Sequence, residues 1–376
     1  MNNESSVNKI KRLYQFGQSP WYDNIDRRII DNGELKGLLD MGVMGVTSNP
    51  TIFEKAINGS SVYDEKIATL HQQGAKTDVI YDELTADDVR DAADLFLGVY
   101  ERTKGLDGYV SIEVLPLYAN DANKTVEYAR YILRKINRKN IMIKVPATPE
   151  SRRAIRMLTR EGINVNATLI FSVPQYEHVA AAYLEGLWDR LQDGKEINNI
   201  FSVASVFVSR IDTKTDQIID ALCRRIDDYG KREQLHGLKG TIAVSNCKMI
   251  YQNFKEIFSE RSFGALKAKG ANMQRPLWAS TSTKNLAYSD LLYVDNLIGP
   301  FTVNTMPHQT LMAFADHGRS FLTLESKLER ARGNLVLFKE LGVNLESICD
   351  EALASGVEAF KCSFEAIIES LKKKAA

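Results

Sequence analysis

The sequence contains few cysteines, and no pattern connects them. The four, Cys223, Cys247, Cys349 and Cys362, are scattered, with no Cys-x-x-Cys spacing and nothing that resembles a disulfide framework. Such sparse, unpatterned cysteines are typical of proteins from a reducing compartment. We therefore expect a cytoplasmic protein.

Motifs of several common catalytic sites are also missing. There is no Gly-x-Ser-x-Gly, His-Glu-x-x-His, Walker loop or Gly-x-Gly-x-x-Gly, and the five histidines lack metal-ligand spacing. We interpret His308, just after a predicted strand, as structural, although it could border a site. The usual hydrolase, metalloprotease and nucleotide-binding signals are thus absent.

The chain has no excess of charge of either sign and no long apolar run. It carries 48 basic and 48 acidic residues, and no run approaches 18 apolar residues. Residues 1–6 (MNNESS) lack the apolar core of a signal peptide. We expect neither nucleic acid nor a membrane as partner.

What the sequence does have is a regular alternation of short, β-branched apolar runs with longer amphipathic stretches. This rhythm predicts an α/β fold, namely a (β/α)8 TIM-type barrel with helical insertions and a C-terminal helix. A chain of 376 residues could hold two or three domains, but such barrels often form one, and we expect a single barrel domain over residues 1–376. The predicted strands are 21–25, 43–48, 109–115, 141–147, 163–170, 201–209, 276–281 and 301–305.

Helical signals complete this picture. Thr148-Pro149 and Ser172 are typical helix starts, and apolar residues recurring over 357–371 predict a final helix with one buried stripe. Residues 50–108 and 213–275 are too long for simple connections. We interpret both as helical excursions from the barrel.

Lys144 is the most informative single residue, because it interrupts an apolar strand, residues 141–147 (IMIKVPA). Burying an ammonium group costs several kcal/mol. Desolvation can lower a lysine pKa by about 3–5 units from about 10.4, which turns the amine into a nucleophile toward carbonyls. The simpler alternative is that Lys144 ends a strand and pairs with a carboxylate.

Other polar residues lie within or just after the predicted strands. The active site of such a barrel lies at the carboxyl ends of its strands, so these side chains are expected to meet there. Each has an ordinary alternative: Asp23 as a helix cap, Asn49-Pro50 as a turn, Arg210 and Asp212 as a surface ion pair, and Asn166 and Thr168 as groups bonded to backbone. The set is Asp23, Asn49, Glu113, Lys144, Asn166, Thr168, Ser205, Arg210, Ser282 and Lys284.

Together these residue types suggest carbonyl condensation. A neutral lysine attacks a ketone, an acid/base pair moves protons from carbinolamine to imine, and the imine accepts electrons during carbon–carbon cleavage. Amides and hydroxyls would hold a polyol. Arg210 and Lys284 would bind an anion such as phosphate.

From about residue 14 onward the chain resembles the transaldolase family. The resemblance rests on five segments in order along the chain, which cover five strand ends. They are residues 45–53 (GVTSNPTIF), 143–148 (IKVPAT), 161–172 (EGINVNATLIFS), 206–212 (VFVSRID) and 279–285 (ASTSTKN).

The resemblance implies Schiff-base transfer of a dihydroxyacetone unit in the non-oxidative pentose phosphate pathway. Sedoheptulose 7-phosphate or fructose 6-phosphate would be the donor, and glyceraldehyde 3-phosphate or erythrose 4-phosphate the acceptor. No metal or organic cofactor is implied, because the protonated imine serves as electron sink. A monomer or homodimer is expected.

It also implies a role for each site residue. Lys144 matches the Schiff-base lysine, Asp23 the base that takes the C4-hydroxyl proton, and Glu113 with Thr168 the pair that positions a water. Asn49 and Asn166 match residues that hold the donor hydroxyls, and Ser205 with Arg210 match a phosphate site.

The chain departs from the family pattern at the late serine. An arginine follows that serine in the short transaldolases, whereas Lys284 follows Ser282 here, and Ser280 is an alternative to Ser282. The 213–275 region resembles the insertion of the longer bacterial and plant-type subgroup. Two alternatives stay open: a fructose 6-phosphate aldolase, which is shorter and lacks the glutamate, and a catalytically silent sugar-phosphate-binding barrel.

Overall fold

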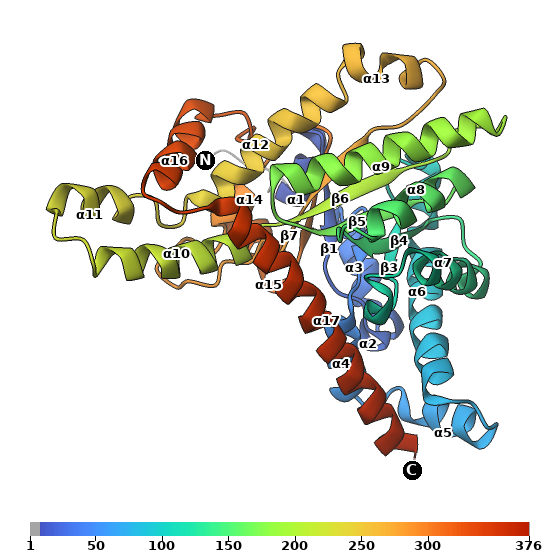
Figure 1. The fold of residues 1–376 in the computed structure, drawn as a ribbon. Helices are drawn as coiled ribbons and strands as arrows, with labels where there is room; N and C mark the ends of the chain where they lie inside the picture. Colours follow the sequence, from blue (N-terminus) through green and yellow to red (C-terminus); the bar gives the residue numbers. More distant parts are fainter. Residues whose placement is uncertain (1–7, 376) are drawn as a thin grey trace, which may run out of the picture.

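A computed structural model describes residues 8–375, in which eight parallel strands close into a barrel surrounded by helices (Figure 1). Neighbours in the barrel are also neighbours in the sequence, and β8 pairs with β1. This confirms the predicted (β/α)8 fold. The strands are β1 (Gln18–Tyr22), β2 (Val46–Thr47), β3 (Val110–Glu113), β4 (Ile141–Pro146), β5 (Val165–Ile170), β6 (Ser202–Phe207), β7 (Gln274–Ala279) and β8 (Thr302–Met306).

Helices follow or interrupt this sequence of strands. The first half of the chain holds α1 (Lys9–Gln15), α2 (Arg27–Asp31), α3 (Glu34–Met41), α4 (Pro50–Asn58), α5 (Asp64–Gln72), α6 (Thr77–Arg102), η1 (Pro116–Tyr118), α7 (Ala122–Ile136), α8 (Ser151–Glu161) and α9 (Val173–Gln192). The second half holds α10 (Ser209–Cys223), α11 (Tyr229–His236), α12 (Ile242–Ile257), α13 (Glu260–Lys267), α14 (Leu292–Asn296), α15 (His308–His317), α16 (Leu328–Glu340) and α17 (Leu345–Ala375). The sequence expectation about residues 1–6 lies outside the described residues.

Two strands lie earlier in the chain than predicted, and the second strand, predicted over 43–48, contains only Val46–Thr47. The first strand spans Gln18–Tyr22 rather than 21–25, because its register with β8 begins at the Gln18–Thr302 pair. The seventh begins at Gln274, two residues early, and ends at Ala279. Both strands start with polar residues that are buried and bonded inside the barrel: the Gln18 amide, for example, donates to Thr302 Oγ1 at 2.9 Å. Apolar patterning cannot detect such residues.

One of the two predicted helix starts is confirmed. Ser172 caps α9, its hydroxyl accepting from the Gln175 amide. The other was wrong, since α8 begins at Ser151 rather than at Pro149. The Thr148 hydroxyl still accepts from the Ser151 amide at 3.2 Å, but it does so from a turn that precedes the helix.

The two long connections are helical, as expected. Residues 50–108 contain α4, α5 and α6, and the stretch after β6 contains α10 to α13. In this second stretch α12 packs against α9 and α16, whereas α10 and α11 project away from the barrel together with α16 (Figure 1).

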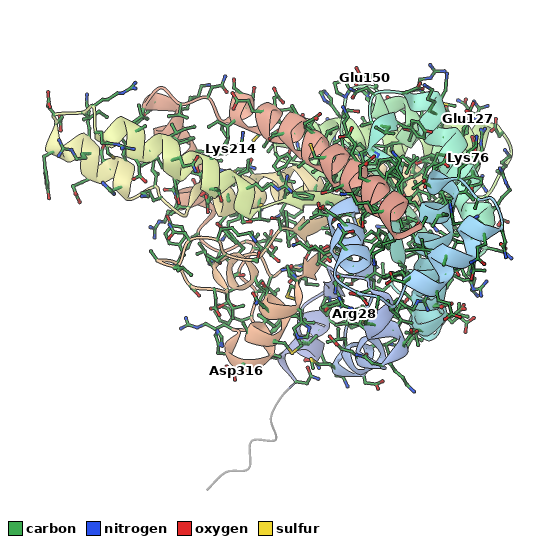
Figure 2. The ribbon with its side chains drawn as sticks, turned by 90° about the horizontal axis from the view of Figure 1, so that it is seen from below. Arg28, Lys76, Glu127, Glu150, Lys214 and Asp316 are labelled. Atoms are coloured by element: carbon green, nitrogen blue, oxygen red, sulfur yellow. The ribbon has the colours of Figure 1, made fainter. Side chains whose placement is uncertain are left out.

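The final helix, α17, crosses the end of the barrel where the strands finish. It contacts α4, α10, η1 and β5, and its predicted buried stripe, Val357, Phe360, Phe364, Ile367 and Leu371, is confirmed. Lys214 of α10, labelled in Figure 2, lies 3.6 Å from Glu351 of α17. The C-terminal helix therefore covers the carboxyl ends of the strands.

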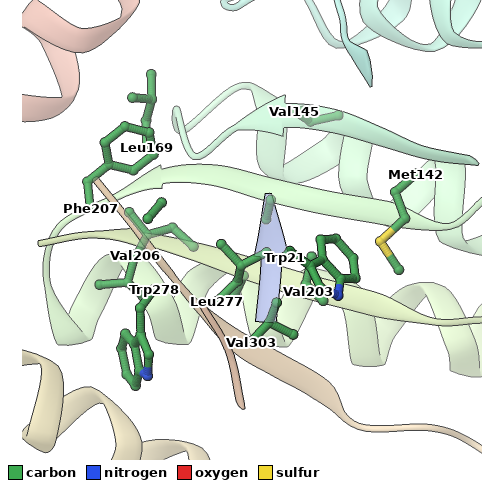
Figure 3. Close-up of a cluster of buried hydrophobic side chains, with 14 of the residues drawn as sticks. Trp21, Met142, Val145, Leu169, Val203, Val206, Phe207, Leu277, Trp278 and Val303 are labelled. Atoms are coloured by element: carbon green, nitrogen blue, oxygen red, sulfur yellow. The ribbon is translucent and has the colours of Figure 1, made fainter. Parts of the chain in front are cut away.

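The interior of the barrel is layered. In-register parallel neighbours point to the same side, which places Trp21, Val203, Leu277 and Val303 on one inner face, all fully buried (Figure 3). Below this apolar layer, Asp107 accepts from Arg275 at 3.0 Å. Above it, the inner face becomes polar.

Candidate functional site

A cavity of about 480 Å³ opens at the carboxyl ends of the strands. Residues from the strands β2, β4, β6, β7 and β8, from the helices α4, α10, α15 and α17, and from the loops that follow β1, β7 and β8 line it. Seven of the ten predicted site residues line this cavity: Asp23, Asn49, Lys144, Ser205, Arg210, Ser282 and Lys284. The other three, Glu113, Asn166 and Thr168, are buried beside or beneath these residues.

Lys144 and Glu113 form a buried pair at the floor of the cavity. They are opposite each other on neighbouring strands, and Lys144 Nζ lies 3.5 Å from Glu113 Oε2. The ammonium also donates to the Ser48 carbonyl at 3.1 Å. Burial raises the pKa of Glu113 to about 7, with Lys144 opposing that rise. Glu113 is thus able to hold a proton near neutral pH.

Asp23 follows β1 and is a second carboxyl group close to Lys144. Its Oδ1 accepts from Thr47 Oγ1 at 2.8 Å, and Thr47 in turn lies 2.6 Å from Thr305. Burial raises the pKa of Asp23, while Lys144, Thr47 and Lys284 act in the opposite direction. The alternative role as a helix cap was wrong, because Asp26 caps α2.

Asn49 begins α4. Its Oδ1 accepts from the Ile52 amide at 3.0 Å, so the residue is a helix N-cap and not simply a turn residue. Because the side-chain oxygen is used in the cap, the side-chain NH2 group of Asn49 is the group that can donate to a ligand in the cavity.

Asn166 belongs to a chain of side-chain hydrogen bonds inside the barrel that joins β3, β5 and β6. Its Nδ2 donates to Ser111 Oγ at 3.1 Å, and its Oδ1 accepts from Ser205 Oγ at 2.6 Å. The alternative of bonds to nearby backbone was therefore wrong for Asn166. These bonds fix the amide orientation below the cavity.

Thr168 lies where β5 is irregular. The register shifts between Ala167 and Ile170, and the buried Leu169 has a φ of +58°, a strained value for a residue with a branched side chain. Thr168 Oγ1 and Glu113 Oε2 are buried, and neither has a hydrogen-bond partner among the described residues. Such oxygens can accept or donate a bond to a ligand or water.

Arg210 and Lys284 bring positive charge to the cavity from α10 and from the loop after β7. The Arg210 guanidinium lies 5.2 Å from the centre of the Phe207 ring, and burial lowers its pKa. The alternative of a surface ion pair with Asp212 was wrong. Asp212 is buried and accepts from the Ala243 amide of α12.

Both candidate serines line the cavity. Ser282 Oγ accepts from Lys284 Nζ at 2.7 Å, whereas Ser280 Oγ lies 2.9 Å from Ser209 Oγ of α10. Ser280 has a φ of +55°, and this left-handed conformation lies directly after the end of β7. The loop that follows it lines the cavity.

Sequence reasoning missed several residues that line the cavity. Thr47 and Thr305 end predicted strands, and the rule applied to the other strands would have found them. Lys55 on α4 and Phe360 on α17 had no such signal, because helices carry them to the cavity. His308 borders the cavity, with its Nδ1 3.2 Å from Tyr22 Oη and 3.6 Å from Glu34.

Residues 8–375 contain no group of three or more His, Cys, Asp or Glu side chains placed to hold a metal ion. None of their helices is long and apolar enough to cross a membrane.

A closed (β/α)8 barrel with a buried amine between two carboxyl groups, beneath a polar cavity, has the form of a barrel enzyme site for carbonyl substrates. Residues 20–371 match the family model described as transaldolase/fructose-6-phosphate aldolase. The chain belongs to this family.

Curated relatives match the chain over almost its full length. It is 44% identical to "Transaldolase" of Trichodesmium erythraeum over 371 residues, which are 98% of each chain. It is also 44% identical to "Transaldolase 2" of Nostoc sp. over 373 residues, again 98% of each. Identity to "Transaldolase" of Thiobacillus denitrificans is 41% over 366 residues, 97% of this chain and 100% of that relative.

Proposed function

We propose that this protein is a transaldolase, a transferase of the pentose phosphate pathway that moves a dihydroxyacetone unit between sugar phosphates. Family membership and full-length relatives that bear this name support the activity. The structural observation that carries the mechanism is the buried Lys144–Glu113 pair at the floor of a polar cavity.

In the first half-reaction the Lys144 ammonium gives a proton to Glu113, and the free amine adds to the ketone carbon of the donor. The resulting carbinolamine loses its hydroxyl as water, and Glu113 supplies the proton for this step. Its pKa of about 7 suits the exchange, since acid and base forms are both accessible near neutral pH. Glu113 Oε2 and Thr168 Oγ1, which form no hydrogen bond among the described residues, would hold the water that relays the proton.

Carbon–carbon cleavage follows from the protonated imine. Asp23 takes the proton of the C4 hydroxyl, the C3–C4 bond breaks, and its electrons move into the imine to give an enamine. The aldose phosphate leaves with the new carbonyl at its former C4. The enamine stays on Lys144 until an acceptor aldehyde arrives and the steps reverse.

The remaining residues would position the substrate. Asn49 and Asn166 would bind the donor hydroxyls, and the hydrogen bonds to Ser111 and Ser205 hold Asn166 in one orientation. Arg210, Ser205, Ser282 and Lys284 would bind phosphate, with Arg210 offering two parallel N–H groups. We assign no role to Ser280 beyond shaping the loop.

Borohydride trapping tests this proposal. The protein is incubated with fructose 6-phosphate and reduced, and its tryptic peptides are weighed. We expect a reduced dihydroxyacetone adduct on Lys144, and none in a Lys144→Ala variant, which we expect to fold normally because it removes a buried charge and its partner Glu113 can then hold a proton. An unmodified Lys144 in folded wild-type protein would instead support a silent sugar-phosphate-binding barrel.

An assay without acceptor separates transfer from simple cleavage. The family description includes fructose-6-phosphate aldolase, which would release dihydroxyacetone continuously from fructose 6-phosphate alone. A transaldolase holds the enamine, so we expect no free dihydroxyacetone and at most about one equivalent of glyceraldehyde 3-phosphate per site until erythrose 4-phosphate is added.

We further propose that the protein acts in the cytoplasm as a monomer or homodimer and that residues 1–376 form one barrel domain. Light scattering after size-exclusion chromatography would give the oligomeric state. Limited proteolysis that released a stable fragment over 213–275 would argue against one domain.

A further inference from the structure

One cation at the cavity has no place in the mechanism described so far. Lys55 lies on α4 and lines the cavity with Asn49 and Ile52 of the same helix. These positions are three residues apart and therefore lie along one face of the helix. The face of α4 that begins at the substrate-binding candidate Asn49 thus ends at a lysine.

Lys55 adds to positive charge that comes from two other elements. Arg210 enters the cavity from α10, and Lys284 enters from the loop after β7. Within residues 8–375, no carboxylate oxygen lies within 4.0 Å of the charged nitrogens of these three side chains. Three cations from three elements therefore face one cavity, and none of them forms an ion pair within that part of the chain.

The charges lie close enough to affect one another. Burial lowers the pKa of Lys284, the charges of Lys55 and then Arg210 lower it further, and Asp23 opposes them as the smallest cause. The charge of Lys55 thus affects the pKa of Lys284 more than the charge of Arg210 does. A dianion placed among the three would remove their mutual repulsion.

We infer that Lys55 is a third phosphate-binding residue, which holds the phosphate of donor and acceptor sugars from the α4 side of the cavity. This inference rests on the proposed function, because it assigns the same cavity to sugar phosphates. Lys284 is a point charge that forms no two-pronged bond to phosphate. Lys55, on a different element, adds a second positive charge for the phosphate dianion, which Lys284 alone does not provide.

The kinetics of Lys55→Met test the inference. Because a charge-assisted hydrogen bond to the phosphate is lost, we expect KM for fructose 6-phosphate and the inhibition constant of inorganic phosphate to rise about tenfold or more. The kcat should stay within about twofold. The KM for unphosphorylated glyceraldehyde as acceptor should not change, and Lys55→Arg should restore most of the phosphate effect.

Lys36→Met is the matched control, since Lys36 is an exposed lysine of α3 that does not line the cavity. If Lys55→Met and Lys36→Met have the same KM for fructose 6-phosphate and the same inhibition constant of inorganic phosphate, the inference is overturned. The proposed transaldolase activity would be unaffected by that result. An equal loss with glyceraldehyde would also overturn it, because Lys55 would then act on the fold or the general field.

Calorimetric titration with inorganic phosphate separates this inference from the proposed function. Weaker phosphate binding to Lys55→Met than to Lys36→Met supports an anion site at Lys55 even if the wild-type protein transfers no dihydroxyacetone. Equal binding contradicts the site, whatever the activity.

Discussion

At the scale of single residues, the site is defined by carboxyl groups whose burial favours the protonated form. Glu113 and Asp23 both have raised pKa values, and desolvation is the largest cause for each. Their neighbour Lys144 opposes the rise but does not cancel it. Glu113, with a pKa of about 7, can exchange a proton near neutral pH, as imine chemistry requires.

The raised pKa of Glu113 predicts how its neutral analogue Glu113→Gln changes stability with pH. Between pH 4.5 and about 7 the folded wild-type protein keeps a proton that the unfolded chain has lost, so wild-type stability falls as pH rises through this window. The change corresponds to about 3 kcal/mol at most. Glu113→Gln has no such loss.

Thermal unfolding of both proteins from pH 4.5 to 8 checks this prediction. The difference in stability should move in favour of Glu113→Gln as pH rises and level off above about pH 7. A difference that moves in favour of the wild type would mean that pairing with Lys144 outweighs burial and lowers the pKa of Glu113. Activity of the variant should fall by about 10²- to 10⁴-fold at all pH values.

At the scale of elements, α17 shapes the cavity although it follows the last strand by about forty residues. Phe360 lines the cavity, and Thr51 of α4 bonds to Ser363 of α17 at 2.9 Å. Gly356 lies where α17 passes over β5 and α10: a Cβ there would lie 2.9 Å from Leu169 and 3.3 Å from the Arg210 guanidinium. The helix approaches the site closely because this residue has no side chain.

Gly356→Ala is therefore expected to behave unlike an ordinary glycine replacement in a helix. Alanine usually stabilises a helix interior by about 1 kcal/mol relative to glycine. Here the methyl group must displace Leu169 or Arg210, so we expect no gain in stability and a several-fold higher KM for fructose 6-phosphate. Gly333→Ala in α16, where nothing lies within 4 Å, is the control and should gain stability with unchanged KM.

At the scale of the whole molecule, the barrel separates structure from chemistry along its axis. At the end opposite the cavity, the Asp107 carboxylate accepts from Arg275, from Trp21 Nε1 at 2.9 Å and from Ser19 Oγ at 2.8 Å. Both members of the ion pair are buried, and the apolar layer lies between them and Lys144. This network closes the bottom of the barrel.

Asp107→Asn tests that separation. Because it leaves the Arg275 charge buried and unpaired, we expect a loss of about 3–5 kcal/mol of stability with little change in KM for fructose 6-phosphate. Asp94→Asn breaks an exposed pair with Arg138 and should cost at most about 1 kcal/mol. Denaturant unfolding would measure the stability of both variants, and steady-state kinetics would measure their KM. A large rise in KM for Asp107→Asn would contradict the separation of structure from chemistry.

Local patterning was enough to predict much of this protein. Eight apolar runs predicted the eight strands in order, since burial of a strand depends on its own side chains. The polar residues at the strand ends include seven whose side chains line the cavity. The motifs that contain Asn49, Lys144 and Arg210 also indicated the family, because each is a short continuous segment of the chain.

Other features depended on contacts between distant parts of the chain. The start of β1 is set by its register with β8, and the burial of Arg275 by Asp107, 168 residues away. Neither leaves an apolar signal in the sequence. Lys55 and Phe360 reach the cavity only because α4 and α17 pack across the ends of the strands. The sequence by itself determined the barrel and most of the site residues at its strand ends. Closure of the barrel and helix packing decided which other side chains join them. Those positions follow from long-range contacts, which local patterns do not encode.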